Sequence, residues 1–131
     1  MSGVTGEVNA IQFGRMAPTV TVSDIAAAIR FYTTILGFEK TFENGNPVGF
    51  VILEKDQGEL HLSLNSDHRG TTQNVAHLLV SDTSALYAVC ERNGVRIIKG
   101  LREADYGLRG FVFADPDGNR IDVGQRIQAQ A

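Results

Sequence analysis

Residues 19–25 read Thr-Val-Thr-Val-Ser-Asp-Ile, and this short stretch decides the fold. The alternating β-branched residues at 19–22 favour a strand, because such side chains pack well on a pleated surface. Ser23 and Asp24 follow at once, and their side-chain oxygens are typical caps of a helix N-terminus. Apolar residues then recur at the spacing of one helix face, at Ile25, Ile29, Tyr32 and Leu36. The stretch therefore predicts a strand that leads directly into a helix.

Three further strands are expected after this helix. Gly37 is placed to end the helix, because glycine readily adopts the left-handed conformation of a helix C-terminus. Residues 38–43, 49–53 and 60–64 then have the β-branched and apolar character of short strands, with Gly- and Asn-containing turns between them. The first half of the chain is therefore predicted to be a βαβββ unit.

The second half repeats the same landmarks. Val80-Ser81-Asp82 matches the strand end and cap of the first half, and Gly94-Val95 matches Gly37-Phe38 after a helix of nearly equal length. Strands are expected at 75–80, 95–98, 108–113 and 120–123, with a tight turn at 115–118 between the last two. Internal repetition of this kind indicates a duplicated structural module.

The repeat also predicts the domain organisation. Residues 1–10 are expected to form an N-terminal tail, and residues 11–126 a single domain. Within it, module one spans about 11–66 and module two about 73–126. The predicted fold class is α+β, with two βαβββ modules in tandem.

Composition excludes several classes of function. A net charge of −3 and a pI near 5.5 argue against nucleic acid as a partner, because phosphate binding usually needs a basic patch. No apolar run reaches the roughly 18 residues that cross a bilayer, so no membrane partner is expected. The single cysteine, Cys90, cannot form an internal disulfide and is expected to be a small buried group. A cytoplasmic location fits these features best.

Two motifs together resemble the vicinal oxygen chelate superfamily of glyoxalases, bleomycin-resistance proteins and extradiol dioxygenases. The first is Val20–Asp24 leading to Phe31-Tyr32 and Leu36-Gly37-Phe38, and the second is Asp115-Pro116-Asp117-Gly118-Asn119 before the last strand. The resemblance covers about residues 12–125. It implies that the two modules form a curved mixed-sheet cup, in which ligands and metals bind.

The metal site that the superfamily implies can be tested position by position. Metal-dependent members hold a divalent ion with one ligand from the first and one from the last strand of each module. Counted from the two Val-Ser-Asp motifs, the repeat places these positions at Ala17, His61, Val75 and Asp122. Ala17 and Val75 cannot bind a metal, whereas a catalytic divalent site usually has about three protein ligands. We therefore expect no metal cofactor.

One alternative metal site stays open. His77 lies two residues beyond Val75 and should share its face of the strand. A set of His61, His77 and Asp122 would resemble the arrangement of two histidines and one carboxylate that holds a divalent Fe, Mn, Ni, Co or Zn ion. With this set the chain would be a metal-dependent lyase, isomerase or dioxygenase.

Only two of the four expected ligand positions hold a side chain that can bind a metal. In this the chain is similar to the bleomycin-resistance-like branch of the superfamily. The segments Gly58–Leu62 and Asp115–Gly124 share this resemblance. It implies a homodimer that binds a small molecule without metal, in grooves where identical subunits meet, and that can confer resistance by sequestration. No catalytic residue is predicted.

Candidate ligand-binding residues follow from the chemistry of such a cup. Aromatic and apolar burial would supply affinity, and a few polar groups would fix orientation. The candidates are Phe50, His61, Ser63, His77, Tyr106, Arg109, Phe111 and Asp122. For each Phe the competing interpretation is packing in the core. The sequence does not fix the strand parity near Arg109, so Phe111 and Phe113 could equally face the helices.

Overall fold

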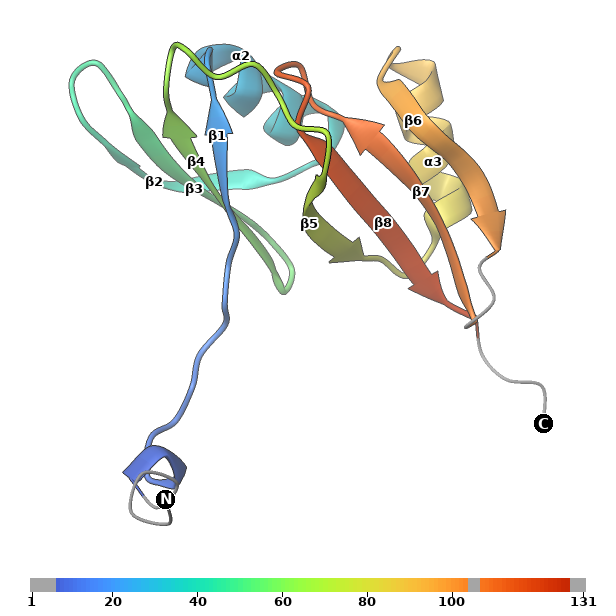
Figure 1. Ribbon diagram of the computed structural model, residues 1–131, viewed down its shortest axis with the longest axis horizontal. Coiled ribbons are helices and arrows are strands. Elements are labelled where there is room, and N and C mark those ends of the chain that lie inside the picture. The colour runs from blue at the N-terminus through green and yellow to red at the C-terminus, as the bar shows by residue number, and fades with distance from the viewer. Residues whose placement is uncertain (1–6, 104–106, 128–131) are drawn as a thin grey trace.

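Two four-stranded sheets, one from each half of the chain, form the framework of the protein (Figure 1). The structure is a computed structural model, and it describes residues 7–103 and 107–127. The strand order is β1-β4-β3-β2 in the first sheet and β5-β8-β7-β6 in the second. In each sheet the first strand pairs in parallel with the last, and the other pairs are antiparallel. The prediction of an α+β fold with two βαβββ modules is confirmed.

Module one follows the predicted order closely. Its elements are β1 (Thr19–Val22), α2 (Ile25–Arg30), a π-helical turn η1 (Phe31–Ile35), β2 (Glu39–Asn44), β3 (Phe50–Lys55) and β4 (Gly58–Leu64). Asp24 caps α2, since its carboxylate accepts a hydrogen bond of 3.0 Å from the Ala27 backbone N–H. Gly37 has a φ of +79°, as its place after the helix predicted.

Module two repeats the arrangement. Its elements are β5 (Asn74–Leu79), α3 (Thr83–Arg92), β6 (Arg96–Glu103), β7 (Leu108–Ala114) and β8 (Arg120–Arg126). β6 extends well beyond the predicted 95–98. Register shifts at Lys99 interrupt the alternation of apolar and polar side chains by which a strand is recognised in a sequence. Within the described ranges, no helix combines the length and the apolar character that a membrane crossing needs.

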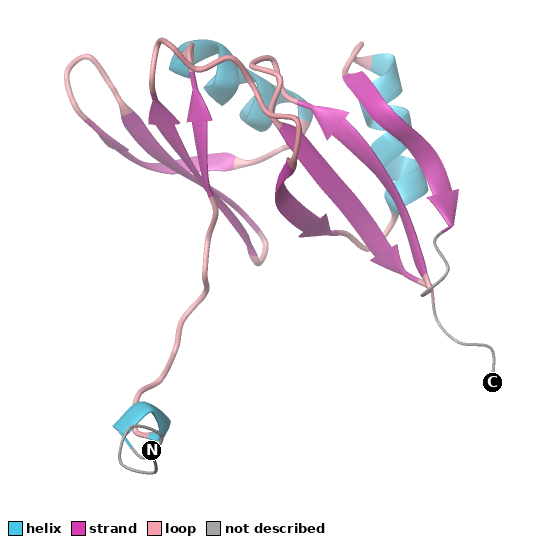
Figure 2. Cartoon of the chain, viewed as in Figure 1, coloured by secondary structure: helices cyan, strands magenta, loops and turns pink. Residues whose placement is uncertain are grey.

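Each sheet has one face covered by a helix and one open face. On β4, Leu60 and Leu62 are buried towards the helix side, and His61 between them points to the other side. Asp122 on β8 likewise alternates with buried neighbours. Figure 2 shows α3 behind β6 and β7, on one face of its sheet. The open faces therefore carry the polar residues of the last strands.

Cys90 on α3 lies in the core. Its side chain is fully buried, and burial raises the pKa of the thiol to about 11. A thiol with this pKa stays protonated at neutral pH and is a poor nucleophile. The prediction of a small buried group is confirmed.

Asp115, at the start of the turn between β7 and β8, bonds across to module one. Its Oδ2 accepts a hydrogen bond of 2.9 Å from the hydroxyl of Tyr32, and both residues are buried. Burial, together with the negative charge of Asp115, raises the pKa of Tyr32 well above its ordinary value. The phenol therefore stays a neutral donor, and the pair is a buried link between the two modules.

The same turn makes two further links to module one. The Asp117 carboxylate accepts hydrogen bonds from the backbone N–H and the hydroxyl of Ser23, at 2.6 and 2.5 Å. The Asn119 amide donates to the Thr21 carbonyl at 2.8 Å. The motif that carried the resemblance is thus a junction between the modules, and the sequence predicted only a tight turn.

Candidate functional site

Aromatic and polar side chains from several strands gather on the open face of the first sheet. His61 on β4 lies beside Thr19 on β1 in the hydrogen-bond register. The Phe50 ring packs edge to face against His61, with centroids 5.4 Å apart, and Phe42 packs against Phe50. Ser63 lies opposite Phe50. The structure thus brings three sequence candidates, Phe50, His61 and Ser63, to one surface.

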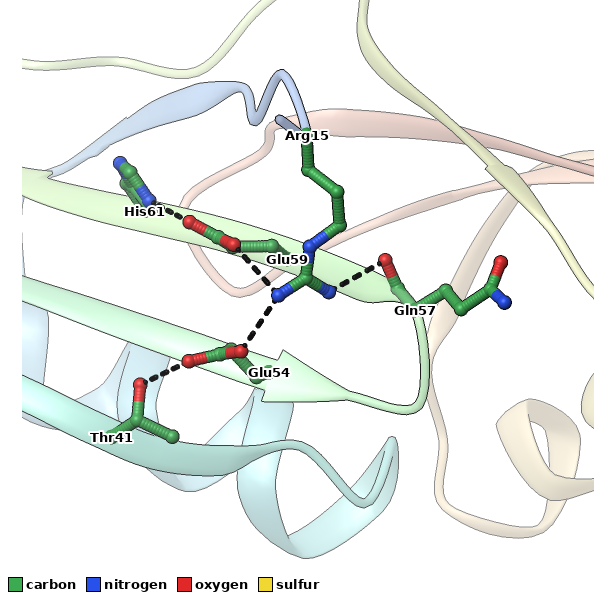
Figure 3. Close-up of polar contacts among 6 residues, drawn as sticks. All are labelled: Arg15, Thr41, Glu54, Gln57, Glu59 and His61. Carbon is green, nitrogen blue, oxygen red and sulfur yellow. Dashed lines mark hydrogen bonds and ion pairs between the residues drawn. The ribbon is translucent and has the colours of Figure 1, made fainter. Parts of the chain in front are cut away.

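A carboxylate and an arginine extend this surface (Figure 3). Glu59 Oε2 lies 2.7 Å from His61 Nε2, and the other oxygen of Glu59 lies 3.2 Å from the Arg15 guanidinium. Arg15 also donates to Glu54 at 2.9 Å and to the Gln57 carbonyl at 2.9 Å. These contacts orient the imidazole and hold the segment before β1 against the β3–β4 hairpin.

Glu54 is an anchor for Arg15. Hydrogen bonds from the Thr41 hydroxyl and from Arg15 lower the pKa of the Glu54 carboxyl. Glu54 is therefore ionised at neutral pH and serves as an acceptor. Sequence reasoning missed Arg15, Glu54 and Glu59, because Arg15 is about forty residues away from its partners along the chain.

A second histidine–carboxylate pair lies on the open face of the second sheet. His77 on β5 and Asp122 on β8 are direct neighbours in the register, and His77 Nδ1 lies 2.8 Å from Asp122 Oδ2. Their side chains are 45% and 37% exposed. The pair is therefore held by its own hydrogen bond and remains accessible to a ligand.

Ala17 and Val75 are not the direct register neighbours of His61 and Asp122. Thr19 and not Ala17 lies beside His61, and Ala17 precedes β1. In module two, His77 is the neighbour of Asp122, whereas Val75 packs against the core. The sequence repeat shows which residues of the two modules are equivalent. It does not show which residues of neighbouring strands lie side by side, because that depends on the hydrogen-bond register.

The alternative set of three metal ligands does not form within one chain. No group of three His, Cys, Asp or Glu side chains converges in the described part of the chain. His61 is engaged by Glu59, and His77 is engaged by Asp122. The two histidines thus belong to separate pairs on separate sheets.

Three other candidates do not join the open faces. Phe111 is 1% exposed and packs against Tyr87 of α3, with ring centroids 5.1 Å apart. Arg109 lies on the same side of β7 as Phe111 and pairs with Glu103 at 2.9 Å. The parity of β7 therefore turns both away from the open face. Tyr106 lies outside the described residues.

A cavity of about 350 Å³ lies between the two modules. Its walls include Met16 and Glu59 from module one, and His77 and Leu79 from module two. Most of the other lining side chains are apolar, among them Leu36, Phe38 and Leu60. One member of each histidine–carboxylate pair thus borders this cavity, which makes it the candidate ligand site.

Sequence and structure comparisons place the chain among known proteins. A sequence model of the Glyoxalase/Bleomycin resistance protein/Dioxygenase superfamily matches residues 12–123. A search of curated proteins found no match. Among solved structures, a member of that superfamily from Sphaerobacter thermophilus is 29% identical, with a TM-score of 0.74, and the match covers 89% of this chain and 99% of that chain.

Two more distant structures carry functional names. A bleomycin resistance determinant encoded on the transposon Tn5 is 20% identical, with a TM-score of 0.75 and coverage of 87% of this chain and 98% of that chain. A lactoylglutathione lyase from Agrobacterium tumefaciens is 17% identical, with a TM-score of 0.70 and coverage of 87% and 94%. At these identities the likeness shows the fold alone, and the fold is shared by a resistance determinant and a lyase.

Proposed function

Because the chain belongs to the glyoxalase/bleomycin resistance protein/dioxygenase superfamily, we propose that it is a small-molecule binding protein whose ligand lies between its two modules. The observation that carries this proposal is the cavity of about 350 Å³ bordered by Glu59 and His77. Its volume falls in the range of roughly 300–1,000 Å³ that is usual for small-ligand sites. The apolar lining would supply affinity, and the two histidine–carboxylate pairs would orient polar groups of the ligand.

A second copy of the chain is the proposed cover of this cavity. Met16 and Leu79 line the cavity, yet they are 97% and 51% exposed. Phe13 is also exposed, on the segment that extends away from the sheets before β1 (Figure 1). Apolar side chains gathered at an open surface in this way are typical of a surface that a partner covers. Sedimentation equilibrium should then give twice the 14.2 kDa mass of the chain, and a monomer mass would contradict the dimer.

Sequestration of a toxic compound is the use that we propose for this site. The Tn5 determinant is named for bleomycin resistance, and the two folds are similar. The chain has no tryptophan, so aromatic contacts to a ligand would have to come from Phe and Tyr. The cavity of about 350 Å³ is lined by the aromatic residues Tyr32, Phe38 and Phe113, and its size and lining support a planar apolar compound smaller than bleomycin as the proposed ligand class.

Binding of 2-naphthamide, a neutral planar probe, tests the proposal. Titration followed by backbone amide resonances should shift Glu59, His77 and Leu79, which border the cavity, and leave Glu91 on the exposed side of α3 unchanged. Absence of any shift at large probe excess would contradict the proposed function. Shifts centred on α3 would contradict the location of the site.

A matched pair of variants separates the cavity from general surface effects. Leu79→Asp should weaken naphthamide binding about tenfold or more, because it places a charge where the probe would remove water. Leu64→Asp is the control, since Leu64 is also exposed at a strand end but does not line the cavity. Equal effects of the two substitutions would contradict the assignment.

A further inference from the structure

The wall of the cavity between the modules carries one carboxylate and no basic residue to balance it. Among the described residues that line this cavity, Glu59 is the only acidic one, and neither Lys nor Arg is present. Glu59 lies on β4 beside the buried Leu60, and its side chain is 21% exposed. A carboxylate that is partly removed from water acts on nearby charges more strongly than one in open solvent. The wall therefore has an excess of negative charge.

Arg15 does not cancel this charge, because two carboxylates share it. Its guanidinium lies 2.9 Å from Glu54 Oε1 and 3.2 Å from Glu59 Oε1 (Figure 3). With a neutral imidazole at His61, two carboxylates around one guanidinium leave one negative charge over. Arg15 is also 45% exposed and lies outside the cavity lining, so water screens its charge more than that of Glu59.

The Glu59 carboxylate has acceptor positions left for a ligand. Its Oε2 lies 2.7 Å from His61 Nε2, and its other oxygen is contacted by Arg15. The two oxygens of a carboxylate offer about four lone-pair positions, and these two contacts use about half of them. A donor on the ligand can therefore bind to a remaining position, and an ammonium group has three N–H donors to offer.

His77, on the other side of the cavity, is an acceptor as well. Its Nδ1 lies 2.8 Å from Asp122 Oδ2, and an ionised carboxylate can only accept a hydrogen bond. A neutral imidazole that donates through Nδ1 has no proton on Nε2, so this nitrogen can only accept. Neither Glu59 nor a neutral His77 offers a donor to an anion, whereas N–H groups of a ligand would match both.

The aromatic part of the wall favours the same sign of charge. Tyr32, Phe38 and Phe113 line the cavity, and the face of an aromatic ring attracts a cation. The Tyr32 hydroxyl is not available as a donor to an anion, because it already donates to Asp115 at 2.9 Å. The rings and the two polar groups therefore point to one kind of ligand.

We infer that the ligand of this cavity is a flat aromatic compound with a protonated amino group, and that Glu59 binds this group. The inference rests on the proposed function, because it names the charge of a ligand for that same cavity. The apolar wall binds the rings. Glu59 distinguishes the cation from neutral and anionic compounds of the same shape.

The test compares cationic 2-naphthylmethylamine, neutral 2-naphthylmethanol and anionic 2-naphthoate by calorimetric titration of the full chain at about pH 8, where histidine side chains are ordinarily neutral. Wild-type protein should bind the amine about tenfold or more tightly than the alcohol, as expected for a charge-assisted hydrogen bond. Naphthoate should bind no more tightly than the alcohol. Glu59→Gln keeps the size of the side chain, and it should bring the affinities for amine and alcohol within about twofold of each other.

Glu91→Gln is the matched control, because it removes the same charge from an exposed residue of α3 outside the cavity lining. The preference for the amine should survive this change. A preference that Glu91→Gln abolishes as fully as Glu59→Gln would trace it to the net charge of the protein and overturn the inference.

The remaining outcomes separate this inference from the proposed function. Equal affinities of wild-type protein for amine and alcohol, tighter binding of naphthoate, or a preference that survives Glu59→Gln would overturn the inference and leave the cavity as a ligand site. An equal loss of amine and alcohol binding in Glu59→Gln would show that Glu59 maintains the cavity, and it would also overturn the inference. If none of the probes binds, both proposals fail.

Discussion

Asp115→Ala is expected to lower the free energy of unfolding by about 3–5 kcal/mol, because it removes the buried centre of the junction between the modules. Asp115 Oδ1 accepts from the backbone N–H groups of Asp117 and Asn119, both at 2.9 Å. Its Oδ2 accepts from the Tyr32 hydroxyl at 2.9 Å and from the Asn119 amide at 3.0 Å. Alanine would leave these donors without their acceptor in a buried place. Urea denaturation followed by circular dichroism measures the change.

Two comparisons complete this prediction. Tyr32→Phe removes only one donor and should cost about 1–2 kcal/mol. Glu91→Ala, an exposed change on α3, should alter stability by no more than about 0.5 kcal/mol. A loss below about 1 kcal/mol in Asp115→Ala would show that the junction does not hold the modules together.

Phe111→Ala is expected to cost about 3–5 kcal/mol of stability, the usual range for removal of a buried aromatic ring. The ring is 1% exposed and packs against Tyr87 of α3 and Phe113 of β7. Alanine would leave a cavity between the sheet and its helix. Thermal and urea unfolding of the variant measure the loss.

Phe50→Ala is the matched control for this change. Phe50 lies on the open face of the first sheet, partly exposed, where its ring contacts His61 and Phe42. Loss of this ring should cost clearly less, about 1–2 kcal/mol, because water can fill the space. Equal losses for the two variants would contradict the assignment of the two faces.

The fold could be predicted because its signals are local and occur twice. Asp24 and Asp82 each cap the helix that follows, because each carboxylate accepts a hydrogen bond from the backbone N–H three residues ahead. Five or six consecutive residues therefore specify each strand-to-helix junction. Gly37 ends the first helix for an equally local reason. Such signals do not depend on distant residues, and each of them occurs again at the equivalent place in the second module.

The site was only partly predictable, because it depends on register and strand parity. His77 and Asp122 were both candidates, and the parallel pairing of β5 with β8 brings them together. Phe111 and Arg109 face the helix side, and a shift of one residue in β7 would have turned both to the open face. The sequence alone does not show the hydrogen-bond register, and so it does not show which side chains of β7 face the helix.

The contacts that join distant segments were not predictable. Arg15 reaches Glu54 and Glu59 across the β3–β4 hairpin, and Asp117 reaches Ser23 across the two modules. No spacing rule links residues so far apart in sequence. The role of the Asp115–Asn119 turn as a junction therefore became visible only in three dimensions.

A crystal structure of the protein with 2-naphthamide tests most directly whether the ligand lies between the modules under the cover of a second copy. The expected result is density for the probe in the cavity bordered by Met16, Glu59 and His77, with residues of a second chain closing it. Density in the apolar groove beside Leu86 and Val89 of α3, or a cavity left open to solvent with the probe elsewhere, would contradict it.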